Sequence, residues 1–338
     1  MSPRGILLVN TGTPEAPTPE AIRPYLQRFL SDKRIVSLPD IIWKPILHGF
    51  VLPQRPQKTA EIYRQVWTPA GSPYSLASRS IERKLKRHAA NSATARDDRS
   101  GEPPLVRMAH RYAEPLMLDA LKLFRDHGVH AVTVLPLYPQ QAHATTESVR
   151  DELQRALDEL DYHPQLHFIE NYHDHPLYLQ ALAKNINAAL PPAANPATTR
   201  LIFSFHSTPL KDRRAGDPYC EQTENSALQI AAVAGLPRAL WQVSYQSRFS
   251  DGRKWVGPFL KESLDELLAQ GVRNFYVIAL GFAVDNIETL HEIGHVTAEY
   301  VRQQAATHGI GADEVSFTYI PALNDSDAHL KLLAALVV

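Results

Sequence analysis

The stretch from Arg273 to Glu299 reads RNFYVIALGFAVDNIETLHEIGHVTAE and contains two different periodicities in succession. Phe275–Leu280 is an apolar run with aromatic and β-branched residues, which is typical of a strand buried on both faces of a parallel sheet. Gly281 interrupts this run, and from Asp285 onward the pattern follows a helical period. The stretch therefore predicts a buried strand followed directly by an amphipathic helix.

The predicted helix has two faces of opposite character. Its apolar face gathers Leu290, Ile293, Thr297 and Val301, and its polar face carries Asp285, Glu288, Glu292, His295 and Glu299. Ligands of parallel sheets bind outside the carboxyl ends of the strands, so carboxylates placed there could receive a divalent cation. The alternative interpretation is the solvated side of an ordinary surface helix.

The composition is that of a soluble globular protein with small partners. The chain has 338 residues, of which 44% are hydrophobic and 21% charged, enough for two domains of ordinary size or one large one. Its 35 basic and 36 acidic residues leave a net charge of −1. There is no electrostatic basis for binding nucleic acid.

Cys220 is the only cysteine of the chain. A single thiol excludes an intrachain disulfide and argues against a protein-bound iron–sulfur cluster, so we expect a reducing, cytoplasmic location. The N-terminal sequence predicts neither a signal peptide nor a membrane span. The segment Ile41–Leu52, IIWKPILHGFVL, is too short to cross a bilayer; it is either core or an exposed apolar lip that could touch a membrane peripherally.

Strand-like runs alternate with helical segments along the whole chain. The strand candidates are Gly5–Asn10, Leu105–Ala109, Ala131–Leu137 and Leu166–Glu170 before a Pro/Ala-rich break at Pro191–Pro196, and Leu201–Phe205, Leu240–Ser244, Phe275–Leu280 and Val315–Ile320 after it. This order predicts an α/β fold of two doubly wound, Rossmann-like halves, each with a four-stranded parallel sheet, facing across a cleft. We assign residues 1–175 to the first half, with the lip at about 35–75, and residues 176–338 to the second.

Helix signals are clearest in the first half. Thr18 is a candidate N-cap, and Pro19 and Glu20, which follow it, open a helix toward Leu30. Further helices are expected at Leu116–His127 and Ser148–Asp161. The polar segment Asn91–Pro104 has no apolar period and predicts a surface loop.

His206 ends the first strand of the second half, RLIFSFHSTP, where a βα loop begins. A lone histidine is more often structural than catalytic, but Glu288 is expected at another strand end of the same half. A neutral imidazole accepts a proton and binds borderline metals. A carboxylate also accepts a proton, and it binds hard metals. Together His206 and Glu288 suit a reaction that exchanges protons for a metal ion.

Eight motifs occur in the order and near the spacing of a known family. They are RPQKTAEIYRQVW at Arg55, GSP at Gly71, RYAEP at Arg111, LPLYPQ at Leu135, FSFHSTP at Phe203, GDPY at Gly216, SYQSRF at Ser244 and GFAVDNIETL at Gly281. On these motifs the chain resembles the ferrochelatases, which insert ferrous iron into a porphyrin in the last step of haem synthesis. The similarity runs from Leu7 to Pro321 and implies two chelatase-type halves.

The resemblance also implies roles for individual residues. His206 and Glu288 correspond to the inner metal-site pair, with His206 taking the pyrrole protons. An outer iron path would continue through Glu292 and Glu299. Donors for the porphyrin propionates would be Arg55, Lys58 and Ser247, and the residues that line or support the pocket would be Tyr112, Gln246 and Trp255. For Arg55 and Lys58 the alternative is solvated surface charge.

The resemblance implies no organic cofactor: ferrous iron and porphyrin are substrates, and the loop after the first strand lacks the glycine spacing of a dinucleotide site. Three features depart from the family pattern, namely Asn286, FHSTP at Phe205 and His143. The cysteines that bind a cluster in some members are missing. His173 and His175 in NYHDHP are similar to a metal cluster, but the segment is expected to link the domains, which favours surface or hinge roles. His291 and His295 lie on the Glu288 helix, and only His295 shares its face.

Three activities remain open at this point. We expect protoporphyrin IX as the porphyrin, because VNTGTP near the start is more similar to the protoporphyrin branch. A chelatase for coproporphyrin III or a sirohydrochlorin-type ring is the first alternative, and a porphyrin or haem carrier without turnover is the second. The sequence does not indicate an oligomeric state.

Overall fold

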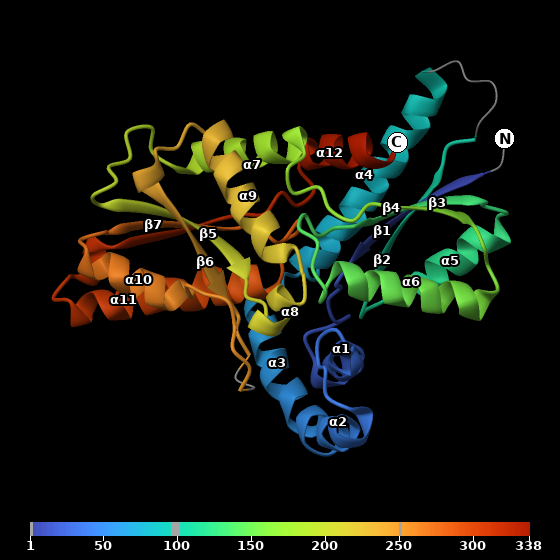
Figure 1. Ribbon diagram of the computed structural model, residues 1–338, viewed down its shortest axis with the longest axis horizontal. Helices are drawn as coiled ribbons and strands as arrows, with labels where there is room; N and C mark the ends of the chain where they lie inside the picture. The colour runs from blue at the N-terminus through green and yellow to red at the C-terminus, as the bar shows by residue number, and fades with distance from the viewer. Residues whose placement is uncertain (1–2, 96–101, 250–251) are drawn as a thin grey trace. The chain divides into compact units, whose positions relative to one another are not determined.

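The computed structural model describes residues 3–95, 102–249 and 252–338, which form two compact units (Figure 1). The first unit is Met1–Asn171 together with Asp325–Val338, and the second is Tyr172–Asn324. The expected division after residue 175 lies close to the boundary at 171. It differs at the other end of the chain, because the C-terminal segment belongs to the first unit.

The first unit contains a four-stranded parallel sheet in the order β2-β1-β3-β4. Its strands are β1 (Arg4–Asn10), β2 (Leu105–His110), β3 (Ala131–Pro136) and β4 (Gln165–Phe168). Leu7 and Leu8 of β1 are fully buried, as expected for a central strand covered on both faces. Helices α5 (Met117–Asp126) and α6 (Thr146–Leu160) pack one apolar side, including Phe124 and Leu153, against one face.

The second unit repeats this architecture with the order β6-β5-β7-β8, again all parallel. The strands are β5 (Thr199–His206), β6 (Trp241–Gln246), β7 (Asn274–Ala279) and β8 (Ser316–Ile320). Helices α10 (Leu260–Ala269) and α11 (Ala298–Thr307) cover one face, while α7 (Pro176–Ala189) and α9 (Tyr219–Val233) lie on the other (Figure 1). The predicted α/β class, and all eight predicted strands, are confirmed.

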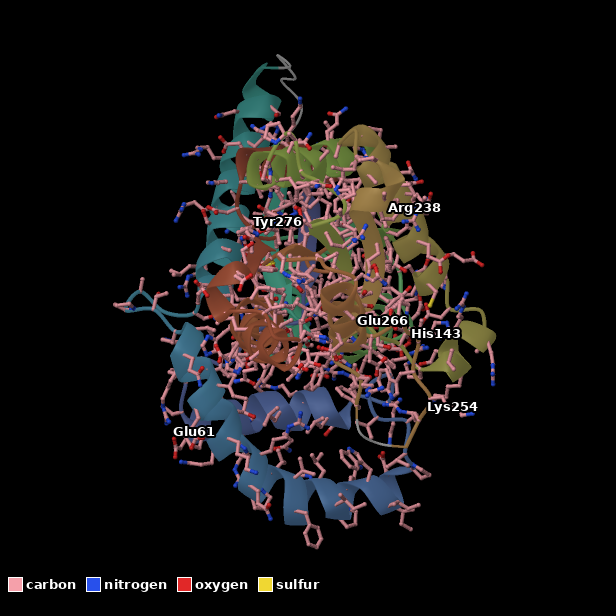
Figure 2. All side chains as sticks on the ribbon, turned by 90° about the vertical axis from the view of Figure 1, so that its left-hand side faces the viewer. Glu61, His143, Arg238, Lys254, Glu266 and Tyr276 are labelled. Atoms are coloured by element: carbon pink, nitrogen blue, oxygen red, sulfur yellow. The ribbon has the colours of Figure 1, made fainter. Side chains whose placement is uncertain are left out.

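The predicted lip is formed by three helical segments that follow helix α1 (Pro19–Ser31) in the first unit. Helix α1 begins at Thr18, whose side chain accepts a hydrogen bond from the Ala21 N–H, so the predicted N-cap is confirmed. It is followed by α2 (Asp40–Ile46), the π-helical turn η1 (Leu47–Val51) and α3 (Leu52–Val66). Side chains project freely from the outer side of these helices (Figure 2).

The outer side of the lip is apolar. Its exposed large hydrophobic side chains include Ile41 and Phe50, at 86% and 68% of their full exposure. Leu47 and Leu52 are buried, so the segment Ile41–Leu52 packs one side into the core and exposes the other side as the predicted apolar lip. No helix in the described parts of the chain is both long and apolar enough to cross a membrane.

Helix α4 (Pro73–Ala95) and the last helix, α12 (Asp327–Val337), pack together in the first unit. Lys84 of α4 donates to the Asp325 backbone carbonyl at 2.5 Å and lies 3.0 Å from its carboxylate, and Ser80 donates to that carboxylate at 2.6 Å. The predicted surface loop Asn91–Pro104 was wrong at its start, because α4 continues to Ala95. Residues 96–101 lie outside the described residues.

The remaining helical segments connect the strands of the second unit. They are α8 (Leu210–Arg214), η2 (Arg238–Leu240), η3 (Glu288–Thr297) and η4 (Ala312–Glu314). Of these, η3 follows β7 and is a π-helix rather than the regular α-helix that the sequence predicted.

Candidate active site

The candidate site lies at the carboxyl ends of β5 and β7 in the second unit. His206 is the last residue of β5, and β5 is flanked by β6 on one side and β7 on the other. Its register partner at the end of β6 is Gln246. The connection after β5 runs over one face of the sheet, and the connections after β6 and β7 run over the other. The crevice between them is where open parallel sheets bind ligands.

Glu288 enters the same site from the start of η3. The preceding Asn286 fixes that start, because its side-chain oxygen accepts hydrogen bonds from the backbone N–H groups of Glu288 at 2.8 Å and Thr289 at 3.3 Å. Asn286 was noted as a departure from the family pattern. In this chain it caps the helix that carries the candidate metal ligand.

The π-helical conformation of η3 changes which residues share a face. Thr297 donates its hydroxyl hydrogen to the Glu292 carbonyl at 2.7 Å, five residues back, and so satisfies an acceptor inside the helix. Single π-turns occur frequently at functional sites because they re-aim side chains. The regular acidic stripe expected from an α-helical period is therefore not present.

Asp285 illustrates this correction. It is 6% exposed and accepts hydrogen bonds from Tyr319, Thr289 and Asn324 at 2.5–2.9 Å. Its carboxylate holds the β7–η3 turn against β8 and the segment that follows β8. Asp285 is thus a structural residue and not part of an open acidic face.

His206 and Glu288 point toward each other across the site. The Nδ1 atom of His206 lies 2.6 Å from the Ser207 carbonyl, which can only accept, so Nδ1 carries the hydrogen of the neutral imidazole. Nε2 is left with its lone pair and lies 3.8 Å from Glu288 Oε2. That Oε2 atom is buried and accepts no hydrogen bond from the described residues.

This separation is too long for a hydrogen bond but suits a shared metal ion. Bonds of about 2.0–2.2 Å from a divalent transition metal to imidazole nitrogen and carboxylate oxygen together exceed 3.8 Å, so both atoms reach one ion without moving. Among the described residues no group of three or more His, Cys, Asp and Glu side chains could hold a metal. An ion bound here keeps open positions, as expected of cargo and not of a structural metal.

Burial raises the pKa of Glu288, although the His206 imidazole opposes this shift. The neighbouring Glu292 carboxylate raises the pKa of Glu288 further. A carboxyl group with a raised pKa takes up a proton more readily at neutral pH. The pair can therefore hold either a proton or a cation, which is the exchange that metal insertion into a porphyrin requires.

Ser247 is hydrogen-bonded to Glu292, the glutamate next to the inner pair. It has a left-handed backbone conformation, with φ +60°, and its hydroxyl donates to Glu292 Oε2 at 2.9 Å. Such a conformation is strained for serine and is concentrated at functional sites. Glu299, by contrast, lies on α11, is exposed and accepts hydrogen bonds from Arg302 and Gln303 of its own helix.

Aromatic side chains line the site next to His206. Phe249 lies edge-on to the His206 ring at 6.3 Å between centroids, and Trp255 lies 5.3 Å from Phe249. Trp255 was predicted as a pocket residue and is half-buried, whereas Phe249 was overlooked. The SYQSRF motif ends at Phe249, so the signal was available in the sequence.

Gln246 and Tyr112 are buried and lie in separate units, and their pocket role remains a prediction. Gln246 accepts a short hydrogen bond from Ser204, and its Nε2 has no partner among the described residues. The Tyr112 hydroxyl donates to Asp32 at 2.7 Å within the first unit. Arg55 and Lys58 are exposed on α3, and their propionate role remains a prediction.

The other histidines occupy varied environments. His175 accepts from the Leu177 N–H at the start of α7, and His173 contacts Asn225 at 3.3 Å. His291 is 9% exposed on η3, whereas His295 is exposed. His143 is half-buried in the turn before α6.

The two parallel sheets, with a histidine at the end of β5 facing a carboxylate at the start of η3, are the arrangement expected of a metal chelatase fold. SirB from Bacillus subtilis, solved with Fe³⁺, has the same fold with a TM-score of 0.55, although the sequences are only 11% identical; the alignment covers 99% of this chain and 96% of SirB.

Residues 3–338 match the family model "Ferrochelatase". The Vibrio cholerae ferrochelatase is 38% identical over 98% of this chain and 97% of its own length. The coproporphyrin III ferrochelatase of Streptococcus mutans is 39% identical over the same shares. The chain therefore belongs to the ferrochelatase family, whose members are metal-inserting lyases of haem biosynthesis.

Proposed function

We propose that this chain inserts Fe²⁺ into protoporphyrin IX to form protohaem, with release of two protons. The observation that carries the proposal is the unpaired, buried Glu288 Oε2 facing the His206 Nε2 lone pair at 3.8 Å. The reaction is balanced without an oxidant or a reductant, because Fe²⁺ replaces the two pyrrole hydrogens and remains ferrous.

In this proposal His206 is the first proton acceptor. Its Nδ1–H is held by the Ser207 carbonyl, so Nε2 is the basic atom that faces the site. Fe²⁺ reaches Glu288 and His206 and passes from them to the ring. Binding of the macrocycle in a bent conformation, with its pyrrole nitrogens turned out of plane, directs binding energy toward the transition state.

The iron path runs through Glu292. Its carboxylate accepts a hydrogen bond from Ser247 and raises the pKa of Glu288, and it lies on the exposed side of η3. Glu299 would be an outer collecting residue on α11. The propionates of the ring would be bound by Arg55, Lys58 and Ser247, with Tyr112, Gln246 and Trp255 supporting the pocket.

Coproporphyrin III is the competing substrate, because the S. mutans relative with that name is as similar to this chain as the V. cholerae one. Anaerobic assays with Fe²⁺ and each porphyrin decide between them. We expect kcat/KM to be at least about tenfold higher for protoporphyrin IX, a difference of about 1.4 kcal/mol in transition-state stabilisation. A preference for coproporphyrin III would overturn the substrate but not the chelatase activity.

In this proposal the porphyrin enters the pocket from a lipid environment by way of the lip. Ile41 and Phe50 are 86% and 68% exposed, so we propose peripheral contact with lipid here. Sedimentation with vesicles tests this contact. Phe50→Ser should lower the bound fraction, and equal binding of the variant and the parent protein would contradict it.

A further inference from the structure

The two candidate metal ligands are held by different elements and not by each other. His206 ends β5, and its Nδ1 atom lies 2.6 Å from the Ser207 carbonyl. Glu288 begins η3, and its Oε2 atom lies 3.8 Å from His206 Nε2, beyond hydrogen-bond distance. The spacing of the pair is therefore set by the backbone that carries each side chain. For Glu288 that backbone is the first turn of η3.

Asn286 supplies the hydrogen-bond acceptors for this first turn. The leading N–H groups of a helix have no carbonyl acceptor within it, and a π-helix, which bonds five residues back, leaves more of them free than an α-helix does. The Asn286 Oδ1 atom accepts from the N–H groups of Glu288 at 2.8 Å and Thr289 at 3.3 Å, and its backbone carbonyl accepts from the Leu290 N–H at 2.9 Å. The shorter of the two side-chain bonds ends on the residue that carries the metal ligand.

Asn286 and Thr289 cap each other. The Asn286 N–H donates to Thr289 Oγ1 at 3.0 Å, while the Thr289 N–H donates to Asn286 Oδ1. This reciprocal arrangement is a capping box in which threonine replaces the usual glutamate. Thr289 is fully buried and its hydroxyl donates to Asp285, whose carboxylate also accepts from Tyr319. The start of η3 is thereby joined to β8.

The position of this cap gives it a consequence beyond the stability of one helix. Glu288 is the second residue after Asn286, so opening of the first turn moves its carboxylate directly. Glu288 Oε2 is buried and accepts no hydrogen bond from the described residues, so that atom does not anchor the side chain. The apparent dissociation constant of a ligand rises in proportion as the binding-competent fraction of the protein falls. A metal ion shared with His206 therefore binds only as well as the turn is closed.

We propose that Asn286 is a positioning residue, which holds Glu288 at the separation from His206 that one ferrous ion spans. The inference rests on the proposed function, because it takes His206 and Glu288 as the iron pair. Asn286 acts through the backbone of Glu288 and is not itself a ligand.

The test measures Fe²⁺ affinity by anaerobic calorimetry without porphyrin, together with kcat and both KM values in the insertion assay. Asn286→Ala removes the acceptor oxygen and should weaken Fe²⁺ binding and raise the KM for Fe²⁺ about fivefold, the factor that corresponds to a lost N-cap. The kcat and the KM for porphyrin should stay within about twofold of the parent, because saturating iron closes the turn. Asn286→Ser keeps an oxygen acceptor at the cap and should restore Fe²⁺ affinity to within about twofold.

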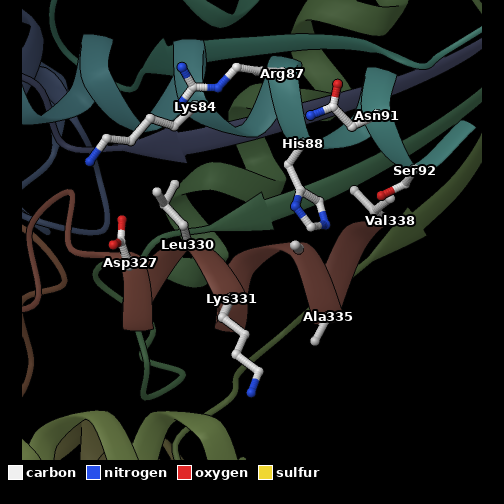
Figure 3. Close-up of a pocket in the computed structure, with 11 residues that line it drawn as sticks. Lys84, Arg87, His88, Asn91, Ser92, Asp327, Leu330, Lys331, Ala335 and Val338 are labelled. Carbon is white, nitrogen blue, oxygen red and sulfur yellow. The ribbon is translucent and has the colours of Figure 1, made fainter. Parts of the chain in front are cut away.

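Two further variants separate positioning from stability. Ser326→Ala removes the N-cap of α12, the helix that packs beside α4 in the first unit (Figure 3); the Ser326 hydroxyl accepts from the His329 N–H at 3.3 Å. This control should lower Tm as Asn286→Ala does, and leave Fe²⁺ affinity and every kinetic constant unchanged. Thr289→Val keeps the buried volume but removes the other half of the capping box, so it should weaken Fe²⁺ binding in the same direction as Asn286→Ala.

Three results would overturn the proposal. They are equal Fe²⁺ affinity in the parent protein, Asn286→Ala and Thr289→Val, an equal loss of affinity in Ser326→Ala, and an Asn286→Ser protein that binds Fe²⁺ as weakly as Asn286→Ala. A parent protein that binds no Fe²⁺ would refute His206 and Glu288 as the iron pair. That failure belongs to the proposed function and is distinguishable, because it appears before any substitution is made.

Discussion

At the scale of single residues, the chemistry of the site depends on the protonation of Glu288. Burial of the carboxyl group raises its pKa, and the neighbouring His206 imidazole partly offsets this rise. A proton is therefore bound more tightly by the native protein than by the unfolded chain. Ionised Glu288 costs stability, and this cost is the consequence of keeping a metal ligand unpaired.

Glu288→Gln should stabilise the empty protein at about pH 7.5, because the buried charge is removed. The stabilisation should disappear as the pH falls toward about 4, where the glutamate is protonated in both the native and the unfolded state. Thermal unfolding of the two proteins across this range measures the effect. A variant that is less stable than the parent at high pH would contradict the raised pKa, and exposed Glu299→Gln serves as the control.

The two outer glutamates should differ in their effect on iron uptake. Glu292→Gln should raise the KM for Fe²⁺ and leave the KM for porphyrin nearly unchanged, because the Glu292 carboxylate is close enough to Glu288 to raise its pKa. Glu299→Gln should alter stability by less than about 0.5 kcal/mol, since its partners lie on its own exposed helix. Both KM values are measured anaerobically. An unchanged iron KM in Glu292→Gln would place the path elsewhere.

At the scale of elements, the lip is anchored at its base and free at its tip. The Trp43 indole N–H donates to the Leu30 carbonyl at 2.6 Å and so attaches α2 to the end of α1. Below it, Asp32 accepts hydrogen bonds from Tyr112 and the Arg34 N–H, and it pairs with Arg111 at 3.1 Å. Ile41 and Phe50 have no such attachment. The element can present apolar surface while its base remains ordered.

Substitutions should separate these two parts of the lip. Phe50→Ser should weaken porphyrin binding and change the free energy of unfolding by less than about 0.5 kcal/mol, because the ring is largely exposed. Trp43→Ser should weaken binding and also destabilise, though by less than the roughly 3–5 kcal/mol of a fully buried aromatic residue. A porphyrin titration beside a denaturation curve measures both. Normal porphyrin binding by both variants would show that the lip is not part of the porphyrin pocket.

The sequence predicted elements better than their internal geometry. All eight strands were predicted because long apolar runs such as Phe275–Leu280 have few alternative structures in an α/β chain. The π-helix was not predicted, because Glu288, Glu292 and Ile293 satisfy an α-helical period equally well. Asp285 was misassigned for the same reason: periodicity gives a face but not the hydrogen bonds that Tyr319 and Asn324 donate from β8 and beyond.

At the scale of the whole molecule, the chain returns to the first unit after completing the second. Asp325 is bound by Ser80 and Lys84, and α12 buries Leu332 and Leu333 completely. The sequence did not indicate this return, because the helical pattern of α12 carries no information about which sheet it covers. The family resemblance pairs His206 with Glu288, and the structure brings their side chains to 3.8 Å, with His206 at the end of β5 and Glu288 at the start of η3; their roles stay a prediction.

Leu333→Ala should destabilise the first unit specifically, by about 2–5 kcal/mol, because it leaves a cavity under α12. Hydrogen exchange should accelerate in β1–β4, which lie more than 150 residues away in sequence, and much less in β5–β8. Leu264→Ala, buried in the second unit, is the matched control and should show the reverse pattern. Faster exchange in β5–β8 alone for Leu333→Ala would contradict the assignment of α12.

The central claim is that His206 and Glu288 act together in metal insertion and are not needed for folding or porphyrin binding. The most direct measurement is anaerobic single-turnover formation of metalloporphyrin by His206→Ala and Glu288→Ala with Fe²⁺, beside a porphyrin titration and a thermal melt of each variant. The account predicts porphyrin affinity close to that of the parent, a folded protein, and a rate of insertion reduced at least about a hundredfold, as expected when a proton-transfer group is lost. Near-normal insertion by either folded variant would contradict it.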